Sequence, residues 1–188
     1  LVLLSVLYSA ISFSSCSNLR RNVVRSRASL SMHKSNSECT CPTNINVLGG
    51  KYQQLPDLFT ACAEQIPTQP MLVDNIHGDS ISLNYGQFND LCTAGASGLQ
   101  ALGLKQGQCV SVFAENSYKW LVMDQSVMKT GAHNAVRGVA APVDELNYIF
   151  DNSKSTGLIV ENEAMLDRLL SDPSWTAEPR FIIILWSS

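Results

Sequence analysis

The stretch Cys109-Val110-Ser111-Val112-Phe113-Ala114 is a nearly unbroken apolar run of the length of a β-strand. Such a run is typical of a parallel strand, because helices cover a parallel sheet on both of its faces. Asn116-Ser117 follows the run and supplies residue types that cap the N-terminus of a helix. We therefore predict a buried strand that leads directly into a helix.

The same alternation continues to the end of the sequence. We predict an extended piece at 133–136, a helix from Pro142 to about Asp151, a strand at 158–160, a helix at 164–170 and a strand at 181–185. Alternating strands and helices with short connections predict an α/β fold with a mostly parallel sheet and flanking helices. The last strand would be an exposed apolar edge, so we expect the domain to be incomplete.

Upstream of the run, the pattern predicts a hairpin and a long helix. A turn-rich spacer at 75–79 separates short apolar stretches at 71–74 and 81–85. Asn84 and Gln87 have the spacing of a capping box, which predicts a helix that begins at Tyr85. Gly103 is expected to end this helix in the left-handed conformation. The predicted apolar face comprises Phe88, Leu91, Cys92, Gly95, Leu99 and Leu102.

The helix that follows Ser117 is expected to end at Gly131. One residue on its predicted inner side is an aspartate, which needs a hydrogen-bond partner if it is buried. That side comprises Trp120, Leu121, Asp124, Val127 and Met128. A tryptophan can stack on a ligand, but Trp120 at helical spacing favours a place in the core.

Charge divides the sequence into two parts. Residues 1–37 contain five basic residues and no acidic one, whereas all 16 acidic residues and eight of the 13 basic residues follow. An acidic domain without clustered lysine and arginine gives no electrostatic footprint for a phosphate backbone, so we predict no nucleic-acid partner. Cys62, Cys92 and Cys109 lie in apolar periodic segments, which predicts buried free thiols.

The N-terminal part resembles a targeting sequence. Residues 1–13 are apolar but shorter than the roughly 20 residues that span a bilayer, and residues 14–37 are rich in serine and arginine. A signal core before such a segment resembles the two-part leader of algal proteins imported into secondary plastids. We predict a cleavable leader (signal plus transit-like) at 1–37 and a linker at 38–54. The alternative is a signal anchor that holds the protein on the endoplasmic reticulum.

Motifs that carry catalysis or phosphate binding are absent from the sequence. Gly49-Gly50-Lys51 lacks the flanking residues of a phosphate loop, and no G-x-G-x-x-G occurs. Gly95-Ala96-Ser97-Gly98 differs from a nucleophile elbow, because Leu99 replaces the second glycine and the segment lies within a helix.

Other chemically useful residues lack partners at a suitable spacing. His77 and His133 have no neighbouring ligand residues of the kind that a metal site requires. Arg137-Gly138 could hold an anion, although an ion pair of Arg137 with Asp144 or Glu145 is favoured. We therefore predict no catalytic, cofactor-binding or metal-binding residue in this chain.

Residues 55–162 resemble the opening of the adenylate-forming (AMP-binding) superfamily, which includes acyl-CoA synthetases, acyl-carrier-protein synthetases and luciferases. The matching blocks are 82–88, 98–113, 115–125 and 131–138, in the order of that family. The last two blocks resemble long-chain acyl-CoA and acyl-carrier-protein synthetases of plastids and cyanobacteria. These blocks contain Asn116-Ser117-Tyr118-Lys119-Trp120, Asp124-Gln125 and Val136-Arg137-Gly138.

The resemblance implies that 55–188 is an incomplete N-terminal AMP-binding domain of a fatty acid ligase. It implies ATP and Mg²⁺ as requirements of the full-length enzyme. A fatty acid would be adenylated and then transferred to coenzyme A or acyl carrier protein, and peripheral membrane association is compatible with such a substrate. The phosphate loop and the other nucleotide-binding motifs of the family lie beyond Ser188, so none maps onto a residue of this chain.

This fragment is accordingly expected to supply scaffold and to be inactive alone. Gly107-Gln108-Cys109-Val110 departs from the family's usual Gly-Asp-x-Val, which a scaffold can tolerate. A non-catalytic binding or interaction module on the same scaffold is the alternative. The acyl chain length, the acceptor thiol and the oligomeric state stay open.

Overall fold

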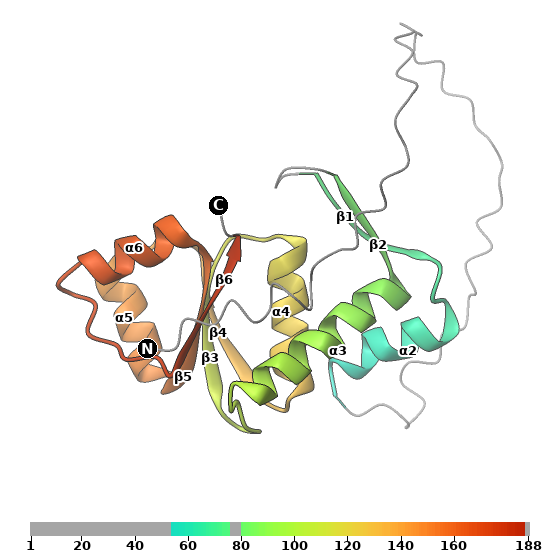
Figure 1. The fold of residues 1–188 in the computed structure, drawn as a ribbon, viewed down its shortest axis with the longest axis horizontal. Helices are drawn as coiled ribbons and strands as arrows, with labels where there is room; N and C mark the ends of the chain where they lie inside the picture. The colour runs from blue at the N-terminus through green and yellow to red at the C-terminus, as the bar shows by residue number, and fades with distance from the viewer. Residues whose placement is uncertain (1–53, 76–79, 187–188) are drawn as a thin grey trace, which may run out of the picture.

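The computed structural model describes residues 54–75 and 80–186 (Figure 1). Within these residues the chain forms a four-stranded sheet and a separate two-stranded sheet. The predicted leader at 1–37 and nearly all of the predicted linker at 38–54 lie outside the described residues, so the leader and the domain boundaries remain predictions.

The larger sheet has the strand order β4-β3-β5-β6, and every neighbouring pair is parallel. Its strands are β3 (Cys109–Phe113), β4 (His133–Arg137), β5 (Ser155–Asn162) and β6 (Phe181–Trp186). All five residues of β3 are buried, which confirms the prediction of a strand covered on both faces. The parallel α/β architecture predicted from the alternating pattern is therefore confirmed.

Helices cover the two faces of this sheet as two layers (Figure 1). Helices α3 (Tyr85–Ala101) and α4 (Tyr118–Lys129) lie on one face, where Leu99, Met123 and Val127 share a core cluster with Val110 and Ile159. Helices α5 (Val143–Asn152) and α6 (Glu163–Ser171) lie on the other face. There the core includes Phe113, Leu146, Phe150, Leu158, Val160, Leu166 and Leu169.

The smaller sheet is the predicted hairpin, formed by β1 (Pro70–Asp74) and β2 (Ile81–Asn84) in antiparallel pairing. It packs with Leu83 on Phe88 of α3, within a third apolar cluster. Helix α2 (Asp57–Gln65) adds to this cluster, because the Phe59 and Phe88 ring centroids are 5.0 Å apart. Helix α2 was not predicted from the sequence.

Both ends of α3 form as the sequence predicts. The Asn84 side chain accepts the Gln87 N–H at 2.8 Å, and the Gln87 side chain accepts the Asn84 N–H at 3.0 Å. Gly103 follows the helix with φ of 88°, a conformation that glycine adopts without steric cost. Helix α4 also begins as predicted, with the Ser117 hydroxyl accepting the Trp120 N–H at 3.1 Å.

The predicted inner side of α4 is wrong in part. Gln125 and Ser126 are buried, whereas Leu121, Asp124 and Met128 are only half-buried. The reason is that α4 packs on two neighbours at once. Met123 and Val127 face the sheet, and Ser126 faces α3.

Candidate functional site

The carboxyl edge of the parallel sheet is the place to examine for a site. In open α/β sheets, ligands bind where adjacent strands send their connections to opposite faces. Here β3 leads to α4 on one face, and its neighbour β5 leads to α6 on the other. The switch point therefore lies between the carboxyl ends of β3 and β5.

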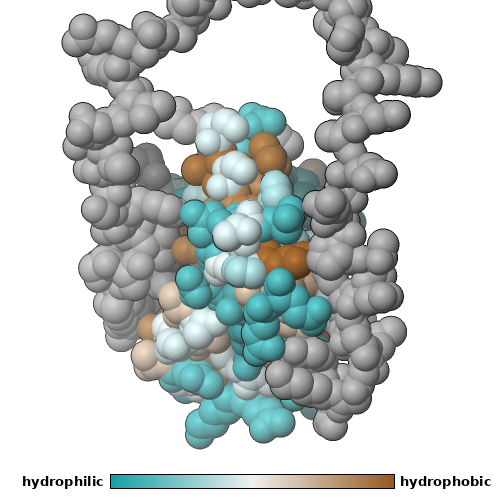
Figure 2. All heavy atoms as spheres, turned by 90° about the vertical axis from the view of Figure 1, so that its right-hand side faces the viewer, coloured by the Kyte–Doolittle hydropathy of each residue, from teal (hydrophilic) through white to brown (hydrophobic). Residues whose placement is uncertain are grey.

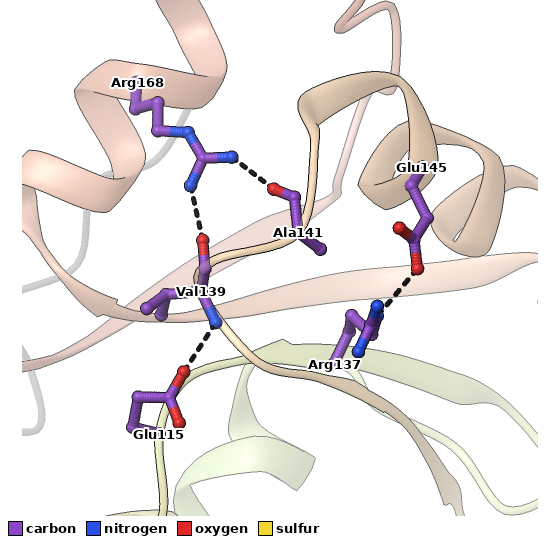
Figure 3. A network of polar contacts seen from close by, with 6 residues as sticks. All are labelled: Glu115, Arg137, Val139, Ala141, Glu145 and Arg168. Carbon is purple, nitrogen blue, oxygen red and sulfur yellow. Dashed lines mark hydrogen bonds and ion pairs between the residues drawn. The ribbon is translucent and has the colours of Figure 1, made fainter.

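The protein's own polar groups join the two strand ends at this point. The backbone N–H of Glu115, just after β3, donates to Oε2 of Glu161 on β5 at 2.7 Å. The Glu115 carboxylate in turn accepts the N–H of Val139 at 3.0 Å (Figure 3). Glu115 thus ties the connection between β4 and α5 to the end of β3.

Arg168 of α6 holds the same connection from the other side. Its guanidinium donates to the backbone oxygens of Val139 and Ala141 (Figure 3). The Val139 peptide is therefore bound at its N–H by a carboxylate and at its carbonyl by a cation. Charge-assisted hydrogen bonds of this kind are stronger than neutral ones, so the connection is firmly placed across the sheet edge.

Arg137 forms the ion pair that the sequence predicted. Its Nε lies 2.7 Å from Oε1 of Glu145, and both side chains are about half exposed, at 49% and 40% (Figure 3). The hydrogen bond to Glu145 and that residue's charge raise the pKa of the Arg137 guanidinium. An exposed pair of this kind contributes little to stability, because water and salt screen its charges. Of the two partners anticipated for Arg137, Glu145 is thus the one bound.

A recess of about 220 Å³ opens beside this network at the N-terminus of α6. Its lining is largely apolar, with charged groups that already bind the backbone. It is lined by Val139, Glu161, Asn162, Ala164, Met165 and Arg168. The Asn162 side chain caps α6 by accepting the Met165 N–H at 2.8 Å, so it too is engaged.

The first turn of α4 fixes the carboxyl end of β6. Lys119 Nζ donates to the Leu185 carbonyl at 2.7 Å and lies 3.9 Å from the centre of the Trp186 ring. The Tyr118 ring meets Trp186 edge-on, with centroids 5.7 Å apart. Burial lowers the pKa of Lys119. These contacts therefore join α4 and β6, which are far apart in the sequence.

Asp124 has the partners that its position on α4 requires. Its carboxylate accepts Asn134 Nδ2 at 2.9 Å and Gln125 Nε2 at 3.0 Å. Burial nevertheless raises the pKa of Asp124, although both hydrogen bonds oppose the shift. The prediction that this aspartate needs a partner is confirmed, and Trp120 packs against the core cluster as anticipated.

The remaining residues considered from sequence do not come together into a site. Ser97 is exposed in the middle of α3, where its hydroxyl donates to the Thr93 carbonyl at 3.0 Å. Cys62, Cys92 and Cys109 are buried free thiols, and burial raises the pKa of Cys92 to about 12. His133 is exposed on β4, and His77 lies outside the described residues. No group of three potential ligand side chains within 54–75 and 80–186 could hold a metal ion.

A family model for AMP-binding enzymes matches residues 59–185, across both sheets and all four flanking helices. The chain belongs to the AMP-binding enzyme family. The family assignment made from the four sequence blocks is thus confirmed.

Relatives of this AMP-binding chain include two chloroplastic proteins of Arabidopsis thaliana. A long-chain-fatty-acid–[acyl-carrier-protein] ligase is 36% identical over 136 residues, which are 72% of this chain and 19% of that protein. A probable acyl-activating enzyme is 32% identical over 145 residues, 77% of this chain and 20% of that protein. The chain spans about a fifth of the length of these relatives.

Solved structures show the same fold. A fatty acyl CoA synthetase of Mycobacterium tuberculosis superposes with a TM-score of 0.62 at 19% identity, over 70% of this chain and 26% of that one. The protein VinN superposes with a TM-score of 0.63 at 16% identity, over 71% of this chain and 34% of that one. At this identity the likeness concerns the fold alone.

Sequence reasoning missed the network of Glu115, Val139 and Arg168. Its members lie 24 and 29 residues apart, and two of its acceptors are backbone carbonyls that any residue supplies. Glu115 lay inside a matched block, but its partner Val139 could be found only from the topology.

Proposed function

We propose that the full-length protein is an AMP-forming ligase for long-chain fatty acids. The observation that supports this is the family match over 59–185, together with relatives named as fatty acid ligases. In the proposed reaction, a fatty carboxylate attacks the α-phosphate of ATP, gives an acyl-adenylate and releases pyrophosphate. The thiol of coenzyme A or acyl carrier protein then displaces AMP.

The adenylation step serves a clear chemical purpose. A carboxylate is a poor acyl donor, because its leaving group would be an oxide, whereas AMP is a good leaving group. Stabilising the charge that develops on the phosphates requires preorganised donors or a metal ion. At the switch point, Glu115, Glu161 and Arg168 already bind the protein's own backbone. ATP and Mg²⁺ are therefore assigned to the full-length enzyme and not to these residues.

The part that the structure describes acts in this proposal as scaffold. Its sheet carries both helix layers, and the connection at 138–142 is held across the sheet edge by Glu115 and Arg168. Two carboxylates at the switch point, Glu115 and Glu161, disfavour a polyphosphate there, because like charges repel. The nucleotide is therefore expected to bind through residues outside this chain.

A plastid is the proposed compartment. The chloroplastic relatives support it, as does the serine- and arginine-rich composition of residues 14–37. None of the helices within the described ranges is long and apolar enough to cross a membrane. The face with α2 and the hairpin is largely hydrophilic, with scattered apolar side chains (Figure 2). Peripheral association with a membrane is proposed only for the full-length enzyme.

Exchange of labelled pyrophosphate into ATP tests this function. We expect fatty-acid-dependent exchange by the full-length protein and none by residues 1–188 alone. A full-length protein that binds fatty acid or carrier protein without exchange would favour the non-catalytic module. Activity of residues 1–188 alone would contradict the scaffold role.

A further inference from the structure

The outward face of α5 and α6 combines apolar and acidic side chains. On α5, Asp144, Tyr148 and Asp151 are exposed and follow each other at helical spacing. On α6, Asp167 and Leu170 are exposed in the same way. Tyr148 is 65% exposed and Leu170 is 56% exposed.

The two helices form one surface. Both start at the carboxyl edge of the sheet and cover the same face. Hydrogen bonds join their ends, since Arg168 of α6 binds the Ala141 carbonyl just before α5. Asn147 of α5 also accepts the Thr176 N–H, after α6, at 2.9 Å. The exposed residues of the two helices are here named the α5–α6 face.

Basic side chains near this face are mostly turned to other partners. Arg168 binds backbone carbonyls, and Arg137 is paired with Glu145. Lys154, which follows α5, is exposed. The face thus keeps an excess of negative charge around its apolar side chains, and a suitable occupant would be basic with apolar residues interspersed.

The sequence itself contains a segment of that composition. Residues 14–37 carry Arg20, Arg21, Arg25, Arg27 and Lys34 without any acidic residue. Within them, Leu19-Arg20-Arg21-Asn22-Val23-Val24-Arg25 alternates short apolar and basic groups. We propose that the α5–α6 face binds this basic segment while the segment is attached to the domain. Arginines would meet the carboxylates, and Leu19, Val23 and Val24 would cover Tyr148 and Leu170.

The connecting chain is long enough for this contact. Residues 38–54 can extend to about 55 Å at roughly 3.3 Å per residue. A compact body the size of the described part has a radius of gyration of about 14 Å, so the reach exceeds the body. Tethering also raises the effective concentration of the segment, which lets several individually weak ion pairs add up.

Limited trypsin digestion of the 188-residue chain tests the proposal, because trypsin cleaves after the five basic residues of the segment. A free synthetic peptide of residues 14–37 serves as the reference, because it shows how the activity of trypsin itself changes with salt. We expect cleavage within 20–34 to be severalfold slower in the chain than in the peptide at 20 mM salt. At 500 mM salt the difference should vanish, since salt screens exposed charges.

Substitutions test whether the α5–α6 face causes the slower cleavage. Asp151→Asn with Asp167→Asn, and separately Tyr148→Ser with Leu170→Ser, should abolish the protection. The matched pair Glu64→Gln with Asp90→Asn, exposed on α2 and α3, should leave it unchanged. Circular dichroism melting would verify that each variant is folded. Equal rates of cleavage in the chain and the peptide at low salt would overturn the proposal. So would an equal loss of protection in the Asp151/Asp167 variant and the Glu64/Asp90 variant.

Discussion

Gly95 of α3 lies against Ser126 of α4 so closely that a Cβ on Gly95 would stand 2.3 Å from the Ser126 Oγ and 2.9 Å from its Cβ. The Ser126 hydroxyl is held in place, because it donates to the Val122 carbonyl at 2.6 Å. The two helices therefore cross at a point where no additional methyl group fits. This crossing sets the distance between α3 and α4.

We expect Gly95→Ala to destabilise the chain, although alanine is the better helix former. Overpacking of this kind costs about 1–3 kcal/mol. Urea unfolding of the variant would measure the loss, and Ser97→Ala, on the exposed side of α3, provides a nearly neutral control. If Gly95→Ala is as stable as the control, the close crossing is wrong.

Lys154 offers a stabilising substitution. It follows α5 with φ of 53°, and it is the one non-glycine residue with positive φ among those described. Glycine adopts this conformation without a Cβ clash, so Lys154→Gly should raise the free energy of unfolding by roughly 0.5–1 kcal/mol. Lys154→Ala keeps the clash and should give no gain. A gain from alanine equal to that from glycine would argue against the left-handed backbone.

The raised pKa of Asp124 predicts a pH-dependent effect. A carboxyl group that binds its proton more tightly in the folded state destabilises the fold as pH rises from its ordinary pKa of 3.8 through the raised value. Asp124→Asn removes this loss. The introduced amide can also donate to Gln125 Oε1, which is buried without a partner in the described region.

The variant should therefore gain melting temperature over the wild type as pH increases from 4, and the gain should level off above the raised pKa. Thermal melting of both proteins between pH 4 and pH 7 would show the trend. A difference that stays constant across this range would contradict the raised pKa.

Arg168 should matter for stability beyond its charge. Arg168→Met keeps much of the aliphatic contact but leaves the carbonyls of Val139 and Ala141 without their cationic donor. We expect a loss of about 1.5–3 kcal/mol, the range for hydrogen bonds to charged groups. Arg180→Met, at an exposed position, is the control. Equal stability of the two variants in urea would show that the connection at 138–142 is held by other contacts.

The parts of the fold that could be predicted from the sequence depend on residues close together in the chain. The capping box of Asn84 and Gln87, the Ser117 cap and the glycines at 103 and 131 each depend on a few neighbouring residues, and all formed as predicted. The buried run at 109–113 predicted a strand covered on both faces for the same reason.

Features that depend on tertiary neighbours were harder to predict. Gln125 and Ser126 are polar, yet they are buried, because α4 packs against α3 as well as the sheet. Helix α2 spans only nine residues and has no side-chain cap, so its pattern gave little signal. The contacts of Glu115 and Arg168 with Val139 could not be predicted, because they depend on the strand order of the sheet.

The function that we propose requires the full-length enzyme to activate a fatty carboxylate by adenylation. The most direct measurement supplies the full-length protein with ATP, acceptor thiol and a fatty acid labelled with ¹⁸O in its carboxylate, and analyses the products by mass spectrometry. The proposed reaction predicts one ¹⁸O atom in AMP, because the carboxylate oxygen that attacks the α-phosphate stays on AMP when the thiol displaces it. Label in inorganic phosphate with formation of ADP, or turnover with no label in AMP, would contradict it.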